Sequence, residues 1–292
     1  MKLSTRSKLA IAALAYRAVH LGRGLAGLGD VVEVQRGGVR WRLDLAEGID
    51  LSIWLLGAFE PATVRAYRRL VRPGATVLDV GANVGAHTLP LAELVGESGR
   101  VIAIEPTREG FAKLAANLAL NPLLAKRVDC RQMVLAAAAE AAPPEAIVAS
   151  WPLAGAEATD AHGGRAWSCE GARVATLDQL CAETGLARVD LIKLDVDGAE
   201  PDVLRGAEVT LGRDAPDMVI ELAPYALERA GESLAGYVGL LTEHGYRLFD
   251  QRTDAMLPND PDALGKLIPA NGGLNVIART PRRGVVSESD SR

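Results

Sequence analysis

The sequence predicts an α/β fold with an open, mostly parallel, doubly wound sheet and a small N-terminal extension. From residue 75 onward, short apolar runs alternate with helical segments, which is typical of a parallel sheet covered by helices on both faces. Several of these runs end in a glycine or a carboxylate. The chain has 292 residues, 49% of them hydrophobic, so it can bury the core of one large domain.

Residues 1–60 are expected to form the N-terminal extension. Residues 1–25 combine a basic start with an interrupted apolar run, which indicates an amphipathic helix. This helix would pack on the domain, or touch a membrane surface or a partner, because its apolar run is too short and too broken to span a bilayer. Residues 31–34 and 39–43 flank a Gly-Gly pair and are predicted to form a β-hairpin.

Residues 61–280 are expected to form the main domain. Its predicted helices cover residues 63–70, 87–95, 108–119 and 200–211, and its predicted strands cover residues 75–80, 100–105, 128–135, 189–195 and 217–222. Two late strands, residues 246–250 and 274–278, are expected to pair as an antiparallel edge.

Two further segments are predicted to be irregular. Residues 141–174 are rich in Ala, Gly and Pro, which indicates either a functional loop or solvated padding. Residues 281–292 are expected to be a disordered tail.

Charge and cysteine content argue against nucleic-acid binding, a zinc site and a disulfide framework. The formal net charge is −5, without the basic footprint of a nucleic-acid-binding protein. Three widely spaced cysteines indicate neither a zinc site nor a disulfide framework, so a reducing, cytoplasmic location is expected.

The first strand of the sheet leads into residues 79–85, Asp-Val-Gly-Ala-Asn-Val-Gly, at the edge where open α/β sheets bind ligands. Gly81 and Gly85 let the backbone turn sharply and approach a ligand. A nicotinamide enzyme would carry Gly-x-Gly-x-x-Gly here, but Asn83 replaces the central glycine. The carboxylate of Asp79 disfavours a pyrophosphate and is compatible with the ammonium and sulfonium groups of S-adenosylmethionine.

The next two strands supply further candidate contacts to S-adenosylmethionine, the methyl donor. Glu105 ends the second strand, where a carboxylate can accept hydrogen bonds from both hydroxyls of a ribose. Nicotinamide enzymes share this feature, so Glu105 does not discriminate between the two cofactors. We expect Met133, Val134 and Leu135 on the third strand to flank the adenine.

Residues 191–200, Leu-Ile-Lys-Leu-Asp-Val-Asp-Gly-Ala-Glu, form a second dense motif. Asp195 is expected at the carboxyl end of a buried strand, facing the same crevice, where an acid is costly unless it is paired or used. Asp197 and Glu200 either belong to the same site or stabilise the start of the following helix.

The two motifs, with Ala-Ile-Glu-Pro between them and Gly57-Ala58-Phe59-Glu60 before them, resemble the FkbM family of methyltransferases over roughly residues 57–222. The resemblance implies a Rossmann-like class I methyltransferase fold and O-methylation of a hydroxyl on a sugar, glycan or polyketide-like product. It also implies that five residues belong to the donor site, namely Asp79, Gly81, Asn83, Gly85 and Glu105. The segments after Met133 and through Trp167 match poorly, so the acceptor is not predicted.

Methyl transfer to an alcohol calls for a base or a metal, because a neutral hydroxyl is a weak nucleophile. Asp195 is the first candidate for the base, His87 the second and His162 the third. In a metal-assisted alternative, Asp195, Asp197 and Glu221 would hold Mg²⁺.

Three other functions compete with this prediction. An NAD-dependent oxidoreductase on a related fold is disfavoured by the missing central glycine. A DNA-base methyltransferase should carry an Asp/Asn-Pro-Pro-aromatic loop after the fourth strand, where this chain has Asp-Val-Asp-Gly. A non-catalytic scaffold would bind the donor without turnover. The expected partner is a small-molecule or glycan acceptor and not a nucleic acid.

Overall fold

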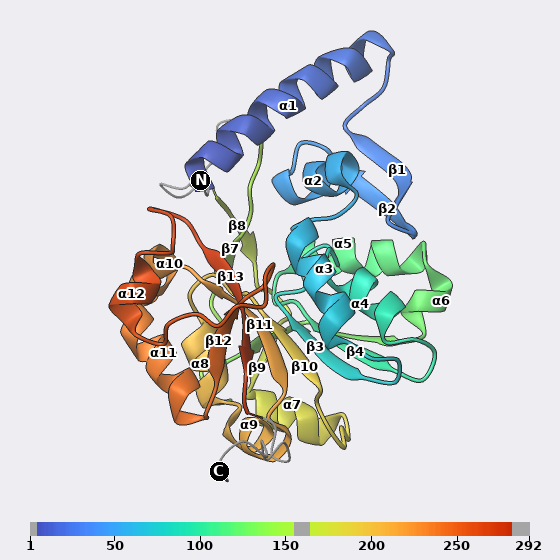
Figure 1. Cartoon of the computed structure of the whole chain (residues 1–292). Helices are drawn as coiled ribbons and strands as arrows, with labels where there is room; N and C mark the ends of the chain where they lie inside the picture. Colours follow the sequence, from blue (N-terminus) through green and yellow to red (C-terminus); the bar gives the residue numbers. More distant parts are fainter. Residues whose placement is uncertain (1–4, 155–163, 282–292) are drawn as a thin grey trace, which may run out of the picture.

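A seven-stranded sheet lies at the centre of the structure, a computed structural model that describes residues 5–154 and 164–281 (Figure 1). The strand order is β12-β13-β11-β10-β3-β4-β5. Neighbouring strands from β11 to β5 are parallel, and β13 runs antiparallel to both of its neighbours, which confirms the predicted antiparallel edge. The strands are β3 (Thr76–Val80), β4 (Arg100–Ile104), β5 (Val128–Arg131), β10 (Leu191–Leu194), β11 (Asp217–Leu222), β12 (Arg247–Asp250) and β13 (Leu274–Arg279).

The order of the strands reverses beside β3. The chain proceeds from β3 through β4 to β5 in one direction and later returns to β10 on the other side of β3. Open α/β sheets bind ligands in the crevice at the carboxyl ends of the strands at such a reversal. The fold therefore places a candidate site at the ends of β3 and β10.

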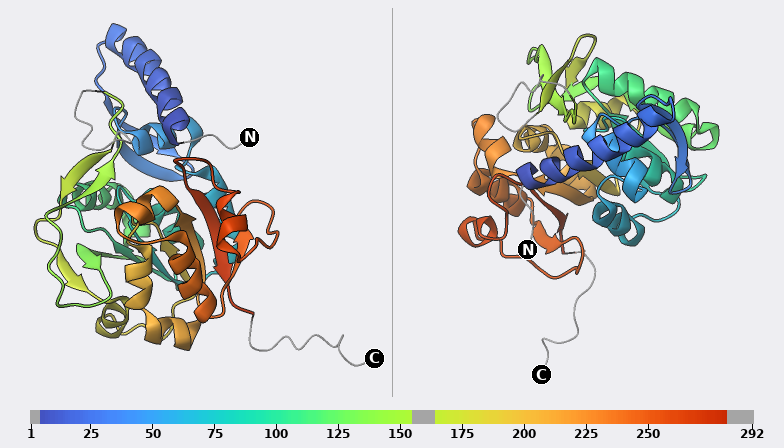
Figure 2. Two further views of the ribbon diagram at one scale, coloured as in Figure 1. Left: turned by 90° about the vertical axis from the view of Figure 1, so that its left-hand side faces the viewer. Right: turned by 90° about the horizontal axis from the view of Figure 1, so that it is seen from above.

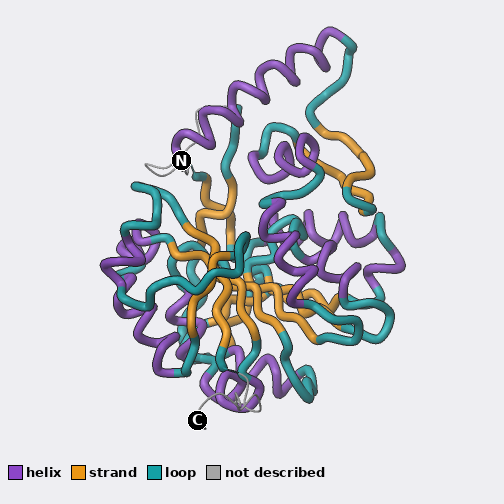
Figure 3. Tube along the Cα trace, viewed as in Figure 1, coloured by secondary structure: helices purple, strands orange, loops and turns teal. Residues whose placement is uncertain are grey.

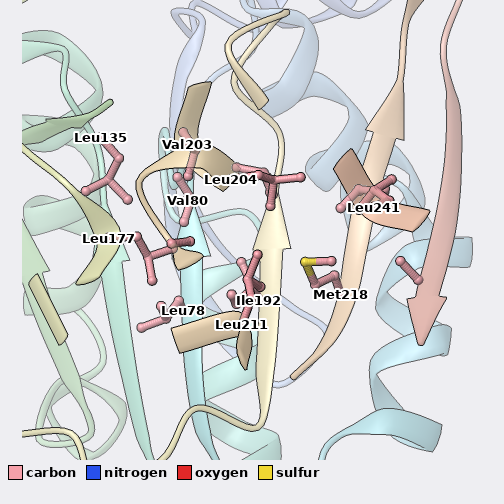
Figure 4. Packing of buried hydrophobic residues seen from close by; sticks show 14 of the residues in the cluster. Leu78, Val80, Leu135, Leu177, Ile192, Val203, Leu204, Leu211, Met218 and Leu241 are labelled. Atoms are coloured by element: carbon pink, nitrogen blue, oxygen red, sulfur yellow. The ribbon is translucent and has the colours of Figure 1, made fainter. Parts of the chain in front are cut away.

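Helices cover both faces of the sheet, as Figure 3 shows. On one face, Leu78, Ile192 and Met218 of the strands pack with Leu204 and Leu241 of the helices (Figure 4). The elements of this layer are α7 (Leu177–Glu183), α8 (Glu200–Arg205), α9 (Glu208–Asp214), α10 (Pro224–Arg229), α11 (Leu234–Glu243) and α12 (Pro261–Gly265). The opposite face is covered by α3 (Pro61–Leu70), α4 (Thr88–Leu94), α5 (Arg108–Ala119) and α6 (Pro122–Ala125).

The chain begins with α1 (Thr5–Leu25) and the predicted hairpin, whose strands β1 (Val31–Arg36) and β2 (Val39–Asp44) pair antiparallel. A helix that was not predicted, α2 (Gly48–Leu56), follows. Trp41 and Leu51 from this region pack with Leu114 of α5, so the extension shares a core with the main domain. The division at residue 60 stays a prediction. Within the described residues, every helix is too short or too polar to cross a membrane.

Two predicted elements are broken in the structure. The strand predicted over residues 128–135 ends at Arg131, and β6 (Met133–Leu135) leaves the sheet to pair in parallel with β9 (Arg173–Ala175). The helix predicted over residues 200–211 is divided into α8 and α9. A Cβ atom on Gly206 would lie 2.3 Å from the carbonyl oxygen of Ala136. The backbone therefore passes close to Ala136 at Gly206, between the two helices.

The segment predicted to be irregular contains two more strands, β7 (Ala146–Ser150) and β8 (Arg165–Ser168), which pair antiparallel. The expectation of an irregular segment was therefore wrong for these residues. Residues 155–163, with the third candidate base His162, lie outside the described residues, as do residues 282–292 of the expected tail.

Candidate active site

The turn after β3 is the tightest feature of the site. Gly81 and Asn83 have φ angles of 84° and 48°, in the left-handed region that glycine and asparagine tolerate best. A Cβ atom on Gly81 would lie only 2.0 Å from the carbonyl oxygen of Asp195, at the end of β10. The amides of Gly81 and Ala82 both donate to the carbonyl oxygen of Ile104, at 3.0 Å. The turn therefore joins the ends of three adjacent strands, and only glycine fits where it touches β10.

Glu105 closes the turn from the side of β4. Its Oε2 atom accepts a hydrogen bond from the amide of Asn83 at 2.7 Å, and its Oε1 atom accepts one from the amide of Thr107 at 2.9 Å. Burial raises the pKa of Glu105, although these hydrogen bonds act against the shift. Oε1 also accepts a hydrogen bond from the hydroxyl of Thr107 at 2.5 Å, which fills both of its acceptor positions. Oε2 keeps a second position that can receive a hydrogen bond from a ligand.

A pocket opens beside this turn, at the carboxyl ends of β3, β4 and β10. Its wall combines polar groups of the turn with apolar side chains from β6 and β7. It includes the three residues predicted to flank an adenine. The lining residues include Gly81, Asn83, Glu105, Met133, Val134, Leu135, Ile147, Asp195 and Asp197.

Two predicted donor residues lie behind this pocket and not in its wall. Asp79 points to the other face of the sheet, where its Oδ2 atom accepts a hydrogen bond from the hydroxyl of Thr88 at 2.6 Å. Gly85 packs against α5, and a Cβ atom there would lie 2.8 Å from Cδ1 of Leu114. In the described structure, the pocket brings together three of the five predicted donor residues, namely Gly81, Asn83 and Glu105.

Asp195 lines the pocket and is paired to a buried lysine. Nζ of Lys193, on β10, lies 3.2 Å from Oδ2 of Asp195, and the Lys193 side chain is 4% exposed. Burial alone would lower the pKa of Lys193, but the carboxylates of Asp195 and Asp79 raise it above its usual range. The ammonium of Lys193 therefore stays charged and holds the Asp195 carboxylate in place.

Beyond Lys193 lies a group of polar side chains, which we call the inner polar cluster: the half-buried Glu60 and the buried Tyr67, Asp79, His87 and Lys193. His87 lies between the rings of Phe59 and Tyr67, with its Nε2 atom 3.8 Å from Oε2 of Glu60. Burial and the charge of Lys193 hold the pKa of His87 well below its usual range. Among the described residues, neither ring nitrogen of His87 has a hydrogen-bond partner, nor does the hydroxyl of Tyr67 or Oδ1 of Asp79.

Such a concentration of unpaired buried polar atoms is unusual, because each one costs free energy of desolvation. Here they meet around the cation that holds Asp195. The inner polar cluster is therefore a candidate place for a bound hydroxyl compound or for ordered water.

The three carboxylates considered as magnesium ligands do not make such a site. No group of three or more His, Cys, Asp or Glu side chains in residues 5–154 and 164–281 is arranged to hold a metal ion. The structure thus does not support the magnesium alternative at Asp195, Asp197 and Glu221.

Sequence reasoning missed Lys193 and Glu60 as members of the site. A lysine in the run Leu-Ile-Lys-Leu is a readable signal, because a lysine is almost never buried without a partner. Glu60 carries a weaker signal. It has a φ of 44°, and its carboxylate accepts a hydrogen bond from Asn275 at 2.6 Å, far away in the sequence.

The order of the seven strands, with its single antiparallel strand, is that of the class I methyltransferase fold, and the pocket lies beside the glycine turn. Residues 79–248 match the methyltransferase FkbM domain family. This match covers more than half of the chain, which therefore belongs to the FkbM methyltransferase family and is a methyltransferase.

Individual relatives match over limited regions. The AMB antimetabolite synthetase AmbE of Pseudomonas aeruginosa is 29% identical over an alignment of 224 residues, and the match covers 63% of this chain and 10% of that protein. Ribosomal RNA large subunit methyltransferase E of Acidithiobacillus ferrooxidans is 37% identical over 78 residues, 25% of this chain and 31% of that protein. The chain thus spans a third or less of the length of these relatives.

Similar solved structures include a methyltransferase FkbM and TYW2. The methyltransferase FkbM of Methylobacillus flagellatus is 15% identical, with a TM-score of 0.41, covering 74% of this chain and 50% of that one. TYW2 of P. horikoshii, in complex with MeSAdo, is 16% identical, with a TM-score of 0.45. The match covers 90% of this chain and 81% of that one.

Proposed function

We propose that this methyltransferase uses S-adenosylmethionine to methylate a hydroxyl of a sugar, glycan or polyketide-like small molecule. The observation that carries the proposal is the position of Asp195. Its side chain lines the pocket beside the glycine turn and also pairs with Lys193 of the inner polar cluster. One carboxylate thus lies between a site suited to the donor and a site suited to a hydroxyl.

The pocket has the chemistry that the donor needs. The absence of a side chain at Gly81 lets the turn pack closely against the carbonyl of Asp195, so that the backbone of the turn lines the pocket. Glu105 retains an acceptor position on Oε2 for a ribose hydroxyl. Met133, Leu135 and Ile147 give the pocket an apolar wall suited to an adenine. When bound, the donor supplies an electrophilic methyl carbon. Asp79 and Gly85 would shape this site from behind the turn.

On the acceptor side, Asp195 is the proposed base. Lys193 orients its carboxylate, and the hydroxyl of the acceptor would donate a hydrogen bond to it and then its proton. Holding the acceptor oxygen in line, away from water, is the larger part of the task. The unpaired polar atoms of the inner polar cluster would hold further hydroxyls of the acceptor.

His87 is the second candidate for a role in the reaction. Its low pKa leaves the ring neutral at neutral pH, and the nearby charge of Lys193 opposes its protonation. We therefore propose that His87 positions the acceptor through a hydrogen bond and does not itself collect the proton. A His87→Gln variant would then raise KM more than it lowers kcat.

Mass spectrometry of candidate acceptors tests the function. The protein is incubated with S-adenosylmethionine and, separately, with sugars, glycans, polyketide-like alcohols and total RNA. We expect one added methyl group on a hydroxyl compound and none on RNA. Methylation of RNA would contradict the proposed acceptor class, and donor binding without turnover on any acceptor would favour a scaffold.

A further inference from the structure

One face of the N-terminal helix α1 is fixed to the protein. Tyr16 is 5% exposed and packs in the core cluster that contains Trp41 and Leu51. Its hydroxyl donates a hydrogen bond to Oδ2 of Asp30 at 3.0 Å, and Nδ1 of His20 lies 2.9 Å from Oδ1 of the same carboxylate. These contacts set the rotation of the helix about its axis.

The other face of α1 carries an exposed apolar stripe. Ile11, Leu14, Leu21 and Leu25 recur at helical spacing and are 57%, 70%, 66% and 84% exposed. Figures 1 and 2 show α1 lying along the outside of the molecule, away from the central sheet. Because Tyr16 holds the opposite face, the helix cannot turn this stripe inward. Contiguous apolar surface of this kind marks an interaction site.

The charge around the stripe indicates which partner it suits. The first 25 residues contain five Lys or Arg and no Asp or Glu, although the whole chain has a net charge of −5. Arg17 is exposed on α1. A second copy of this chain would bring two such basic segments together, which like-charge repulsion disfavours.

We propose that α1 binds the surface of an anionic phospholipid membrane, with the stripe Ile11, Leu14, Leu21 and Leu25 in the interface. Leucine side chains would enter the boundary between headgroups and acyl chains, and the basic residues would contact the negative surface. The helix would lie in the plane of the membrane without crossing it.

Co-sedimentation with vesicles tests this proposal. The full chain is mixed with vesicles of equal phosphatidylcholine and phosphatidylglycerol, or with phosphatidylcholine alone. We expect binding to the anionic vesicles, with a partition coefficient at least tenfold higher than for the zwitterionic ones and falling as salt increases. In the double variant Leu14→Glu/Leu21→Glu, the partition coefficient for the anionic vesicles should fall at least tenfold.

A matched control separates the stripe from apolar surface in general. Leu123 on α6 is also 70% exposed, and Leu123→Glu should bind vesicles like the wild type. Unfolding midpoints should agree among all variants, because the substituted side chains are exposed. Arg17→Glu, which leaves the stripe intact, should weaken anionic binding about tenfold or more.

Three outcomes would overturn the proposal: equal binding of the double variant and the wild type, equal binding to both kinds of vesicle, or no binding to either kind. A dimer that the double variant converts to monomer, without vesicle binding, would assign the stripe to a second copy instead.

Discussion

Nζ of Lys193 lies 3.2 Å from the Asp195 carboxylate, and through this contact the interior of the sheet is connected to the wall of the pocket. The lysine is the cation among several carboxylates of the site, since Asp79, Asp195 and Glu60 all raise its pKa. Its loss would leave the buried Asp79 and the half-buried Asp195 and Glu60 without this counter-charge. The stability of the fold and the geometry of the site therefore depend on the same side chain.

The variant Lys193→Met tests the structural half of this dependence. Removing one partner of a buried ion pair typically costs about 3 kcal/mol or more. We expect the free energy of unfolding to fall by about that amount in urea denaturation. The exposed Lys266→Met variant, as the matched control, should change it by about 0.5 kcal/mol or less. Similar effects of the two substitutions would show that Lys193 is not a buried counter-ion.

The variant Asp195→Asn tests the chemical half. Asparagine keeps the size of the side chain but cannot take a proton, so we expect kcat to fall about a hundredfold or more. Affinity for the donor should stay close to that of the wild type, because the turn and Glu105 are untouched. Calorimetric titration and a turnover assay with an identified acceptor measure the two quantities. Full turnover would remove Asp195 from the reaction.

The variant Gly81→Ala tests the close approach of the turn to β10. Its Cβ atom would lie 2.0 Å from the carbonyl oxygen of Asp195, at a φ of 84°. We expect donor affinity to fall at least tenfold and the free energy of unfolding to fall by about 1–3 kcal/mol. Gly239→Ala on α11 has open space around the new Cβ and should stabilise the protein by about 0.5–1 kcal/mol. Normal donor affinity in Gly81→Ala would place the donor elsewhere.

The pH dependence of stability should report on Asp197. Burial, with the charges of Asp195 and Glu200, raises its pKa to about 8, so the folded protein keeps a proton that the unfolded chain releases above about pH 4. The folded state is therefore stabilised at low pH, and this contribution is lost as the pH rises toward 8.

Asparagine tolerates the φ of 53° at this position and removes the titrating group. In Asp197→Asn, we expect a smaller loss of unfolding free energy between about pH 5 and about pH 8 than in the wild type. The exposed Asp262→Asn serves as the control and should lose as much stability as the wild type. An unchanged pH profile in Asp197→Asn would contradict the raised pKa.

Much of the candidate site could be predicted because its signals are local. The positive φ angles at Gly81 and Asn83 follow from residue types that tolerate them, directly after an apolar strand. The side of the sheet to which Asp79 points was also readable. Leu78 and Val80 face the core on one side, and alternation along a strand sends Asp79 to the other.

The parts that were missed depend on contacts between distant segments. β6 leaves the sheet at Gln132 because it pairs with β9, and no local pattern announces that partner. The pairing of Ile147 with Trp167 makes strands of a segment whose composition indicates a loop. Burial of Lys193 likewise becomes interpretable only when Asp195 and Asp79 are seen beside it.

The most direct test of the account is a parallel calorimetric titration of the protein with S-adenosylmethionine and with NAD. We predict saturable one-to-one binding of S-adenosylmethionine that Gly81→Ala weakens at least tenfold, and no heat of binding with NAD. Binding of NAD at the turn, or no binding of S-adenosylmethionine to a folded protein, would contradict it.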